Sequence, residues 1–105
     1  MSTVQVTDDN FQDTVEGNDL VLIDFWAPWC APCRALAPVL EELAAENSNF
    51  IVAKMNTDEN PNIATQHGIM SLPTMMIFKN GQLVDRLVGA QHTKPQIMEK
   101  LQYHF

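Results

Sequence analysis

The chain contains two cysteines, Cys30 and Cys33, and only two positions separate them. A Cys-x-x-Cys pair indicates a redox dithiol beside a strand–helix–strand pattern, or a zinc site where two further ligands are present. The three histidines show no paired spacing that would complete a zinc site. A structural staple is also a poor explanation, because so small a loop restricts the unfolded chain very little. The pair therefore predicts thiol–disulfide exchange.

The cysteines lie between a predicted strand and a predicted helix. Residues 20–26 form a nearly continuous apolar run, which is typical of a central strand covered on both faces. Pro32 begins a helical pattern that we expect to reach about Asn47, with a kink at Pro38. Residues 50–56 indicate the next strand, so this segment reads as a β-α-β unit.

Further elements flank this unit. Residues 4–6 predict a short first strand. Thr7 is expected to cap a helix that carries Asp8 and Asp9 in its first turn and ends at Gly17.

The second half of the chain predicts a short helix, a hairpin and a final helix. Asn60 is expected to cap the short helix, which Gly68 closes, and Asn80-Gly81 is typical of a two-residue turn. That turn joins predicted strands over 74–79 and 82–88. Thr93 is expected to cap a last helix with an apolar face formed by Ile97, Leu101 and Phe105.

Composition limits the classes of function. The 105 residues, 46% hydrophobic and 18% charged, predict a single domain spanning 1–105. Six basic and thirteen acidic residues give a formal charge of −7, which argues against nucleic acid and anionic membranes as partners. The start of the chain has no export signal and no run is long enough to span a bilayer, so we expect a cytoplasmic protein, which we take to be a monomer.

The position of each cysteine suggests its chemical role. Cys30 falls at the start of the predicted helix, where unpaired N–H groups and the helix dipole stabilise a thiolate. Cys33 projects from the first turn on the same side, so it is expected to be the more buried, resolving sulfur. Such exchange requires neither a metal nor a bound cofactor.

Asp24 places one carboxylate inside the apolar run. Ionisation there is costly without a partner. The sequence alone leaves two explanations open: a hydrogen-bonded carboxylate at a strand end, or a proton acceptor with a raised pKa.

The order β-α-β-α-β-α-β-β-α and several short motifs resemble the thioredoxin family along essentially the whole chain. The matching residues are Asp24-Phe25-Trp26-Ala27-Pro28-Trp29-Cys30-Ala31-Pro32-Cys33-Arg34, Pro38, Lys54, Leu72-Pro73-Thr74, Phe78-Lys79-Asn80-Gly81 and Val88-Gly89. The resemblance implies an α/β thioredoxin fold, a mixed five-stranded sheet flanked by four helices. It also implies that strands 74–79 and 82–88 run antiparallel to the other three, and that the Leu72–Pro73 bond is cis.

The resemblance also implies site roles and partners. It favours Asp24 as the group that accepts the proton of Cys33, with Lys54 modulating it and Trp26 among the supporting residues. It gathers a substrate groove around Cys30 from three loops, comprising Trp29, Met70, Ser71, Leu72, Pro73, Gly89 and Ala90. The implied partners are proteins with disulfides and an NADPH-dependent flavoprotein thioredoxin reductase.

Two positions depart from the commonest family pattern, because Ala31 and Ser71 stand where many members have glycine. Alanine favours helix and restricts the backbone, which can shift the balance between dithiol and disulfide. Pro32 favours a reductant, since oxidants and isomerases of the family usually carry histidine there. An oxidase or isomerase is the alternative within redox chemistry, and a binding module with an incidental dithiol is the alternative outside it.

Overall fold

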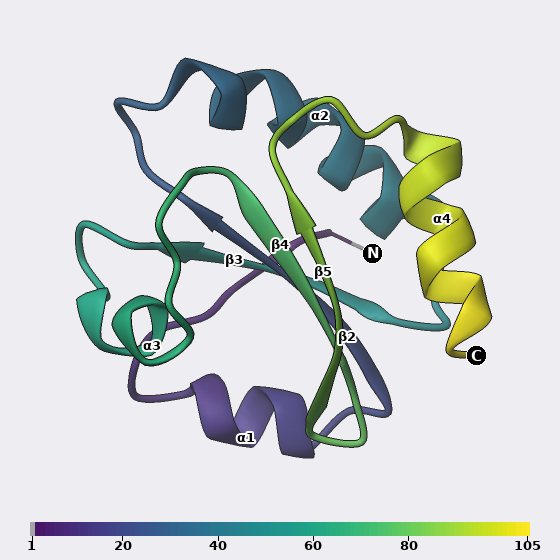
Figure 1. The fold of residues 1–105 in the computed structure, drawn as a ribbon. Helices are drawn as coiled ribbons and strands as arrows, with labels where there is room; N and C mark the ends of the chain where they lie inside the picture. The colour runs from purple at the N-terminus through teal and green to yellow at the C-terminus, as the bar shows by residue number, and fades with distance from the viewer. Residues whose placement is uncertain (1) are drawn as a thin grey trace.

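The computed structural model describes residues 2–105 and contains a five-stranded sheet with two helices on each face (Figure 1). The elements, in chain order, are β1 (Val4–Gln5), α1 (Phe11–Glu16), β2 (Leu20–Trp26), α2 (Ala31–Glu46), β3 (Ile51–Asn56), α3 (Pro61–Gln66), β4 (Thr74–Lys79), β5 (Gln82–Val88) and α4 (Lys94–Tyr103). Their order is the one predicted from the sequence. Within residues 2–105, no helix has the length and apolar character needed to cross a bilayer.

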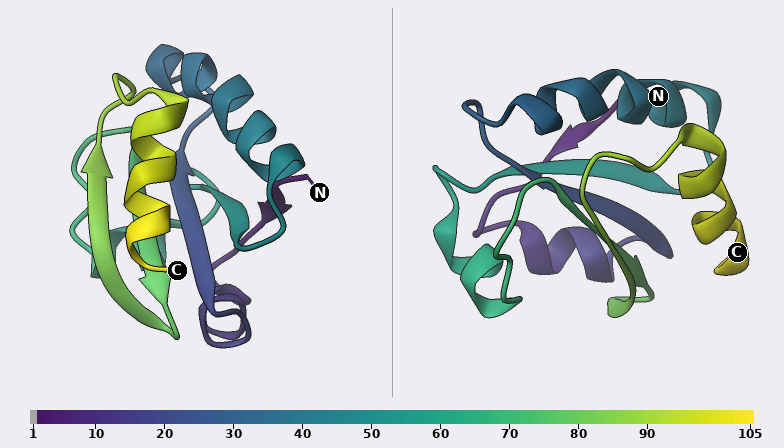
Figure 2. Two further views of the ribbon diagram at one scale, coloured as in Figure 1. Left: turned by 90° about the vertical axis from the view of Figure 1, so that its right-hand side faces the viewer. Right: turned by 45° about the horizontal axis from the view of Figure 1, so that its top comes forward.

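The sheet is centred on β2, in the order β1-β3-β2-β4-β5. Every residue of this strand is buried except Trp26, which is half-buried. Side chains alternate between the two faces of a strand, so a strand buried on both faces is mainly apolar, as β2 is apart from Asp24. Leu20 and Leu22 pack under α2 and α4, whereas Val21 and Ile23 pack under α1 and α3. Figure 2 shows these two helical layers on opposite sides of the sheet.

The expected direction of the last strand was wrong. Strands β1 and β2 both pair with β3 in parallel, β4 is antiparallel to β2, and β5 is antiparallel to β4. Strand β5 therefore runs in the direction of β2, and only β4 is reversed. The cause is the two-residue hairpin turn, where Asn80 and Gly81 have φ values of 52° and 84°. This turn reverses the chain a second time.

The first helix also begins later than expected. It starts at Phe11 and not directly after Thr7. Thr7 instead closes a turn with Asn10: the Asn10 N–H donates to Thr7 Oγ1 at 3.2 Å, and the Thr7 N–H donates to Asn10 Oδ1 at 2.7 Å. Asp8 and Asp9 lie in this turn and do not form the first turn of α1.

The carboxylate of Asp8 caps α3, which is more than fifty residues away in sequence. It accepts hydrogen bonds from the N–H groups of Asn62 and Ile63 at 3.1 and 3.0 Å. The side chain of Asn60, expected to form this cap, instead accepts from the Asp8 N–H at 3.0 Å and forms no side-chain cap hydrogen bond. Asp8 thus fixes the helix that leads into the loop at 69–73.

The last helix has the expected start and an earlier end. Thr93 forms a capping box with Gln96, and Ile97 and Leu101 are fully buried. Phe105 lies beyond the helix and is 56% exposed, with its ring 6.3 Å from that of Phe50. It therefore does not continue the apolar face of α4.

The cap on α3 yields a stability prediction. Replacing Asp8 by alanine removes two acceptors at a helix N-terminus, so we expect the free energy of unfolding to fall by about 1–2 kcal/mol. Asp9→Ala, at the exposed neighbouring position, is the control and should change it by less than about 0.5 kcal/mol. Urea titration at pH 7 measures both values. Equal stability of Asp8→Ala and Asp9→Ala would show that the long-range cap is absent in solution.

Candidate active site around the Cys30–Cys33 disulfide

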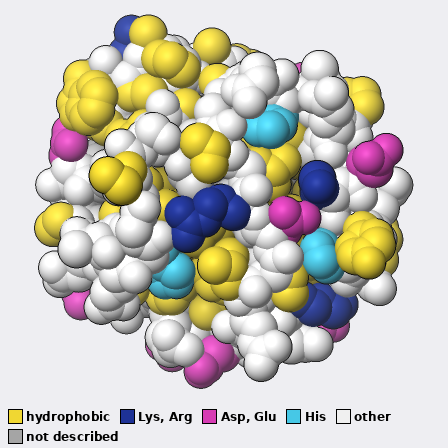
Figure 3. Space-filling model, viewed as in Figure 1, with side chains coloured by type: hydrophobic (Ala, Val, Ile, Leu, Met, Phe, Trp, Pro, Cys, Tyr) yellow, Lys and Arg dark blue, Asp and Glu magenta, His cyan; other side chains and the backbone are white. Residues whose placement is uncertain are grey.

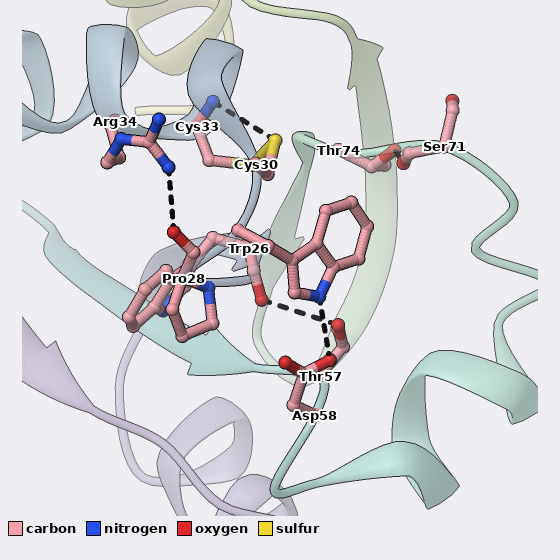
Figure 4. The surroundings of a disulfide bond; sticks show 10 residues. Trp26, Pro28, Cys30, Cys33, Arg34, Thr57, Asp58, Ser71 and Thr74 are labelled. Carbon is pink, nitrogen blue, oxygen red and sulfur yellow. Dashed lines mark hydrogen bonds between the residues drawn. A yellow bond between two sulfur atoms is a disulfide. The ribbon is translucent and has the colours of Figure 1, made fainter.

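Cys30 is the N-cap of α2 and is joined to Cys33 by a disulfide, with their Cα atoms 5.3 Å apart. The Cys33 N–H donates a hydrogen bond to Cys30 Sγ at 3.2 Å (Figure 4). The first N–H groups of a helix have no partner within it, and here the sulfur takes one of them. In the dithiol form, the same donor and the helix dipole stabilise negative charge on Cys30. Both cysteines are buried, with Cys33 2% and Cys30 5% exposed.

Hydrogen bonds from Arg34, Cys30 and Thr57 hold the turn before Cys30 in place. Arg34 donates through Nη1 to the carbonyl of Pro28 at 2.7 Å, and the Cys30 N–H donates to the carbonyl of Ala27 at 3.1 Å. Thr57 donates to the carbonyl of Trp26 from both its N–H and its hydroxyl (Figure 4). The turn at 27–30 is therefore fixed to α2 and to the end of β3.

Asp24 is fully buried, and neither of its carboxylate oxygens has a hydrogen-bond partner. Side chains two positions apart on a strand lie on the same face, so Asp24 shares the face of Leu20 and Leu22, which α2 covers. Desolvation by burial raises the pKa of Asp24 from 3.8 to about 7, against the opposing effect of the positive charge on Lys54. These observations favour a proton acceptor with a raised pKa over a hydrogen-bonded carboxylate at a strand end.

Lys54 lies beside Asp24 on the neighbouring strand. The two residues are register partners between β2 and β3. The Lys54 ammonium stands 4.8 Å from the centroid of the Trp26 ring, where the aromatic face also attracts the cation. The positive charge is thus held on the neighbouring strand, where it can modulate the acidity of Asp24.

Two of the loops expected to form the groove meet beside the disulfide. The Leu72–Pro73 bond is cis, as the resemblance implied, and Leu72 packs against the cluster that contains both cysteines. The Gly89 N–H donates to the carbonyl of Pro73 at 2.8 Å, and Gly89 has a φ of 94°, which favours glycine. Ala90, next along the chain, is partly buried against the core under α2 and α4.

Three other residues of the expected groove are exposed. Met70 is 95% exposed and Trp29 68% exposed, and Ser71 also faces solvent. The indole Nε1–H of Trp29 donates to Asp58 Oδ1 at 3.2 Å. This bond fixes the orientation of the Trp29 side chain.

Three residues with contacts near the disulfide were not predicted from the sequence to belong to the site: Arg34, Thr57 and Asp58. A signal for the last two was present, because polar residues directly follow the strand parallel to β2. The carboxyl ends of parallel strands meet at one edge of a sheet, and there the turn before Cys30 also lies. No local pattern indicated that Arg34 would reach back to Pro28.

Comparison with known proteins places the chain in a family. The thioredoxin family model matches residues 2–103. Thioredoxin 1 of Nostoc sp. is 53% identical over 103 residues, which cover 94% of this chain and 96% of the relative. The chain belongs to the thioredoxin family. Thioredoxin 1 of Synechococcus elongatus is 58% identical over 87 residues, covering 81% of each chain.

Solved structures agree with this membership. A mutant thioredoxin from Halobacterium salinarum has a TM-score of 0.90 and 35% identity, covering 98% of this chain and 90% of that one. Oxidised mitochondrial thioredoxin 3 from Saccharomyces cerevisiae has a TM-score of 0.87 at 28% identity, covering 96% and 94%. The fold is the thioredoxin fold. This family member is a thiol–disulfide oxidoreductase that reduces protein disulfides, and Cys30–Cys33 is its redox-active disulfide.

The buried carboxylate predicts a specific dependence of stability on pH. The pKa of Asp24 is higher in the folded than in the unfolded chain, so the folded state loses stability as pH rises from 3.8 through about 7. This loss amounts to about 4 kcal/mol, of which an alanine cavity offsets about 1 kcal/mol. We therefore expect Asp24→Ala to be more stable than the wild type by about 3 kcal/mol at pH 8, the difference to pass through zero between about pH 4 and 5, and the variant to be less stable by about 1 kcal/mol at lower pH.

Urea titrations of the disulfide form across this pH range measure the difference. Asp9→Ala, which removes an exposed carboxylate, is the control and should show no comparable trend. An Asp24→Ala variant of equal or lower stability at pH 8 would contradict the raised pKa.

Proposed function

We propose that Cys30 attacks the disulfide of a substrate protein and that Cys33 resolves the resulting mixed disulfide. The observation that carries this assignment is the hydrogen bond from the Cys33 N–H to Cys30 Sγ at the start of α2. A thiolate, not a thiol, is the nucleophile in this exchange, and the N–H group at the helix start donates to the sulfur of Cys30, where it stabilises negative charge.

The exchange proceeds in two steps. The Cys30 thiolate bonds to one sulfur of the substrate disulfide, and the other substrate sulfur leaves as a thiolate. The Cys33 thiolate then bonds to Cys30 Sγ, and the second substrate sulfur leaves. Two electrons pass to the substrate, and the Cys30–Cys33 disulfide forms.

Asp24 is proposed to take the proton from Cys33 before the second step. A pKa of about 7 is suited to this task, since a base is most effective when its pKa is near the working pH. The positive charge of Lys54 lowers that pKa, so it keeps a larger fraction of Asp24 ionised and able to accept the proton.

The substrate is proposed to bind along the groove beside the disulfide. An extended segment of the substrate would pair with the backbone near Leu72 in the manner of an added strand. Apolar contacts would come from Trp29 and Met70, the two large exposed side chains on the loops next to Cys30 and Leu72.

The proposed physiological setting follows from this chemistry. A thioredoxin reductase, an NADPH-dependent flavoprotein, would return the disulfide to the dithiol. The chain would act as a single thioredoxin domain over 1–105, as a cytoplasmic monomer with no bound cofactor or metal. It would serve electron transport to protein disulfides and so contribute to cell redox homeostasis.

Trapping the mixed disulfide tests the assignment of the two sulfurs. Mixing insulin with the Cys33→Ser variant should give a stable covalent adduct through Cys30, because no resolving thiol is present. Cys30→Ser is the matched variant, since it also lacks the disulfide, and it should give less than about one tenth as much adduct. Non-reducing gels and mass spectrometry of the linked peptides measure both. An adduct that forms mainly through Cys33 would reverse the roles.

A further inference from the structure

Met70 differs from the other methionines that the structure describes. Its side chain is 95% exposed, whereas Met55, Met75 and Met76 are fully buried. Met98 is partly buried against the core under α2 and α4. Oxidation of methionine follows exposure of the sulfur. Over residues 2–105, a dissolved oxidant therefore meets Met70 first.

The loop that carries Met70 is anchored on both sides. Before it, the Ile69 N–H donates to the carbonyl of Ala64 at 2.9 Å, and the Ile69 side chain packs against the core under α1 and α3. After it, the carbonyl of Ser71 accepts a hydrogen bond from the Thr74 hydroxyl at 2.7 Å. Met70 is therefore exposed on a loop whose backbone is held in place on both sides.

The loop that carries Met70 also contributes an apolar side chain next to the disulfide. Leu72, two residues after Met70, packs against the cluster of Ala27, Cys30 and Cys33. Figure 3 shows hydrophobic side chains gathered at the upper left of the visible face, which is the corner where α2 begins in Figure 1. A thioether at the rim of such a surface is flexible and apolar, so it fits substrate segments of different shapes.

We propose that Met70 is an oxidation site whose sulfoxide lowers the activity of this chain toward protein disulfides while leaving its dithiol chemistry intact. The proposal rests on the proposed function, because it takes Met70 to contact the substrate. The oxidant is a peroxide: one oxygen atom passes to the Met70 sulfur, which loses two electrons, and the peroxide is reduced to water. In the disulfide form neither cysteine presents a free thiol to the same oxidant.

The expected consequence is a change in substrate preference. The sulfoxide is polar, so it weakens contact with an apolar substrate segment. Loss of about half the free energy gained by burying one methionine side chain slows reaction with a protein disulfide about five- to tenfold. A small disulfide such as cystine reaches the sulfur of Cys30 without spanning to Met70, so its rate stays within about twofold. Methionine sulfoxide reductases restore the thioether, which makes the change reversible.

The test begins with the disulfide form of the full chain, treated with hydrogen peroxide that is then removed by catalase. Among the methionines of residues 2–105, peptide mass spectrometry should place the first added oxygen on Met70. The disulfide is next reduced with dithiothreitol and the reagent removed. Single-turnover oxidation of the dithiol is then followed by tryptophan fluorescence after mixing with insulin or with cystine.

Each variant is compared with itself before and after peroxide. Met70→Leu cannot take up the oxygen, so its insulin rate should not change on treatment. Met98→Leu changes a methionine away from the groove, so peroxide should slow its reaction with insulin five- to tenfold, as it does for the wild type. Sulfoxide reductases should restore the insulin rate of both proteins. Oxygen found first at another methionine within residues 2–105, or an unchanged insulin rate with Met70 oxidised, overturns the proposal.

Met70→Asp separates this proposal from the groove on which it rests. The aspartate places a permanent charge at the same rim, so it should slow insulin at least as much as the sulfoxide does. A Met70→Asp variant that reacts with insulin at the wild-type rate shows that the groove itself is misplaced. A slow Met70→Asp variant together with a sulfoxide that has no effect refutes only the oxidation site.

Discussion

The hydrogen bond between the Cys33 N–H and Cys30 Sγ joins the chemistry to the fold, because it is at once a helix cap and a contact of the reactive sulfur. A helix N-terminus must find acceptors for its free N–H groups, and a sulfur in that place is stabilised most when it carries negative charge. The site therefore depends on α2 beginning at Ala31, directly after Cys30. Packing of Leu36, Leu40 and Leu43 into the core holds the helix there.

Burial of Asp24 is the second constraint, and it opposes stability. A fully buried carboxylate with no hydrogen-bond partner is costly, and an apolar side chain would suit the core of β2 better. The cost is consistent with a functional role, because local rules of stability are commonly broken at active sites. The neighbouring strand contributes Lys54, which limits the rise in pKa to a value useful near neutral pH.

Patterns within one element could be read from the sequence, whereas relations between distant segments could not. The apolar run of β2 and the helix cap at Thr93 followed from local spacing. The cap that Asp8 places on α3 joins residues more than fifty positions apart, so no periodicity reveals it. The direction of β5 follows from the two-residue turn at Asn80-Gly81, which makes β5 antiparallel to β4, and not from the resemblance. The contact from Trp29 to Asp58 likewise needed the packed loops.

Competitive alkylation of the two thiols tests the central claim, that the start of α2 makes Cys30 the nucleophile. The dithiol form is treated briefly with limiting iodoacetamide at pH 7, and mass spectrometry locates the label. We expect Cys30 to react at least about tenfold faster than Cys33, since the thiolate is the reactive species. Equal labelling, or faster labelling of Cys33, would show that the helix start does not activate Cys30.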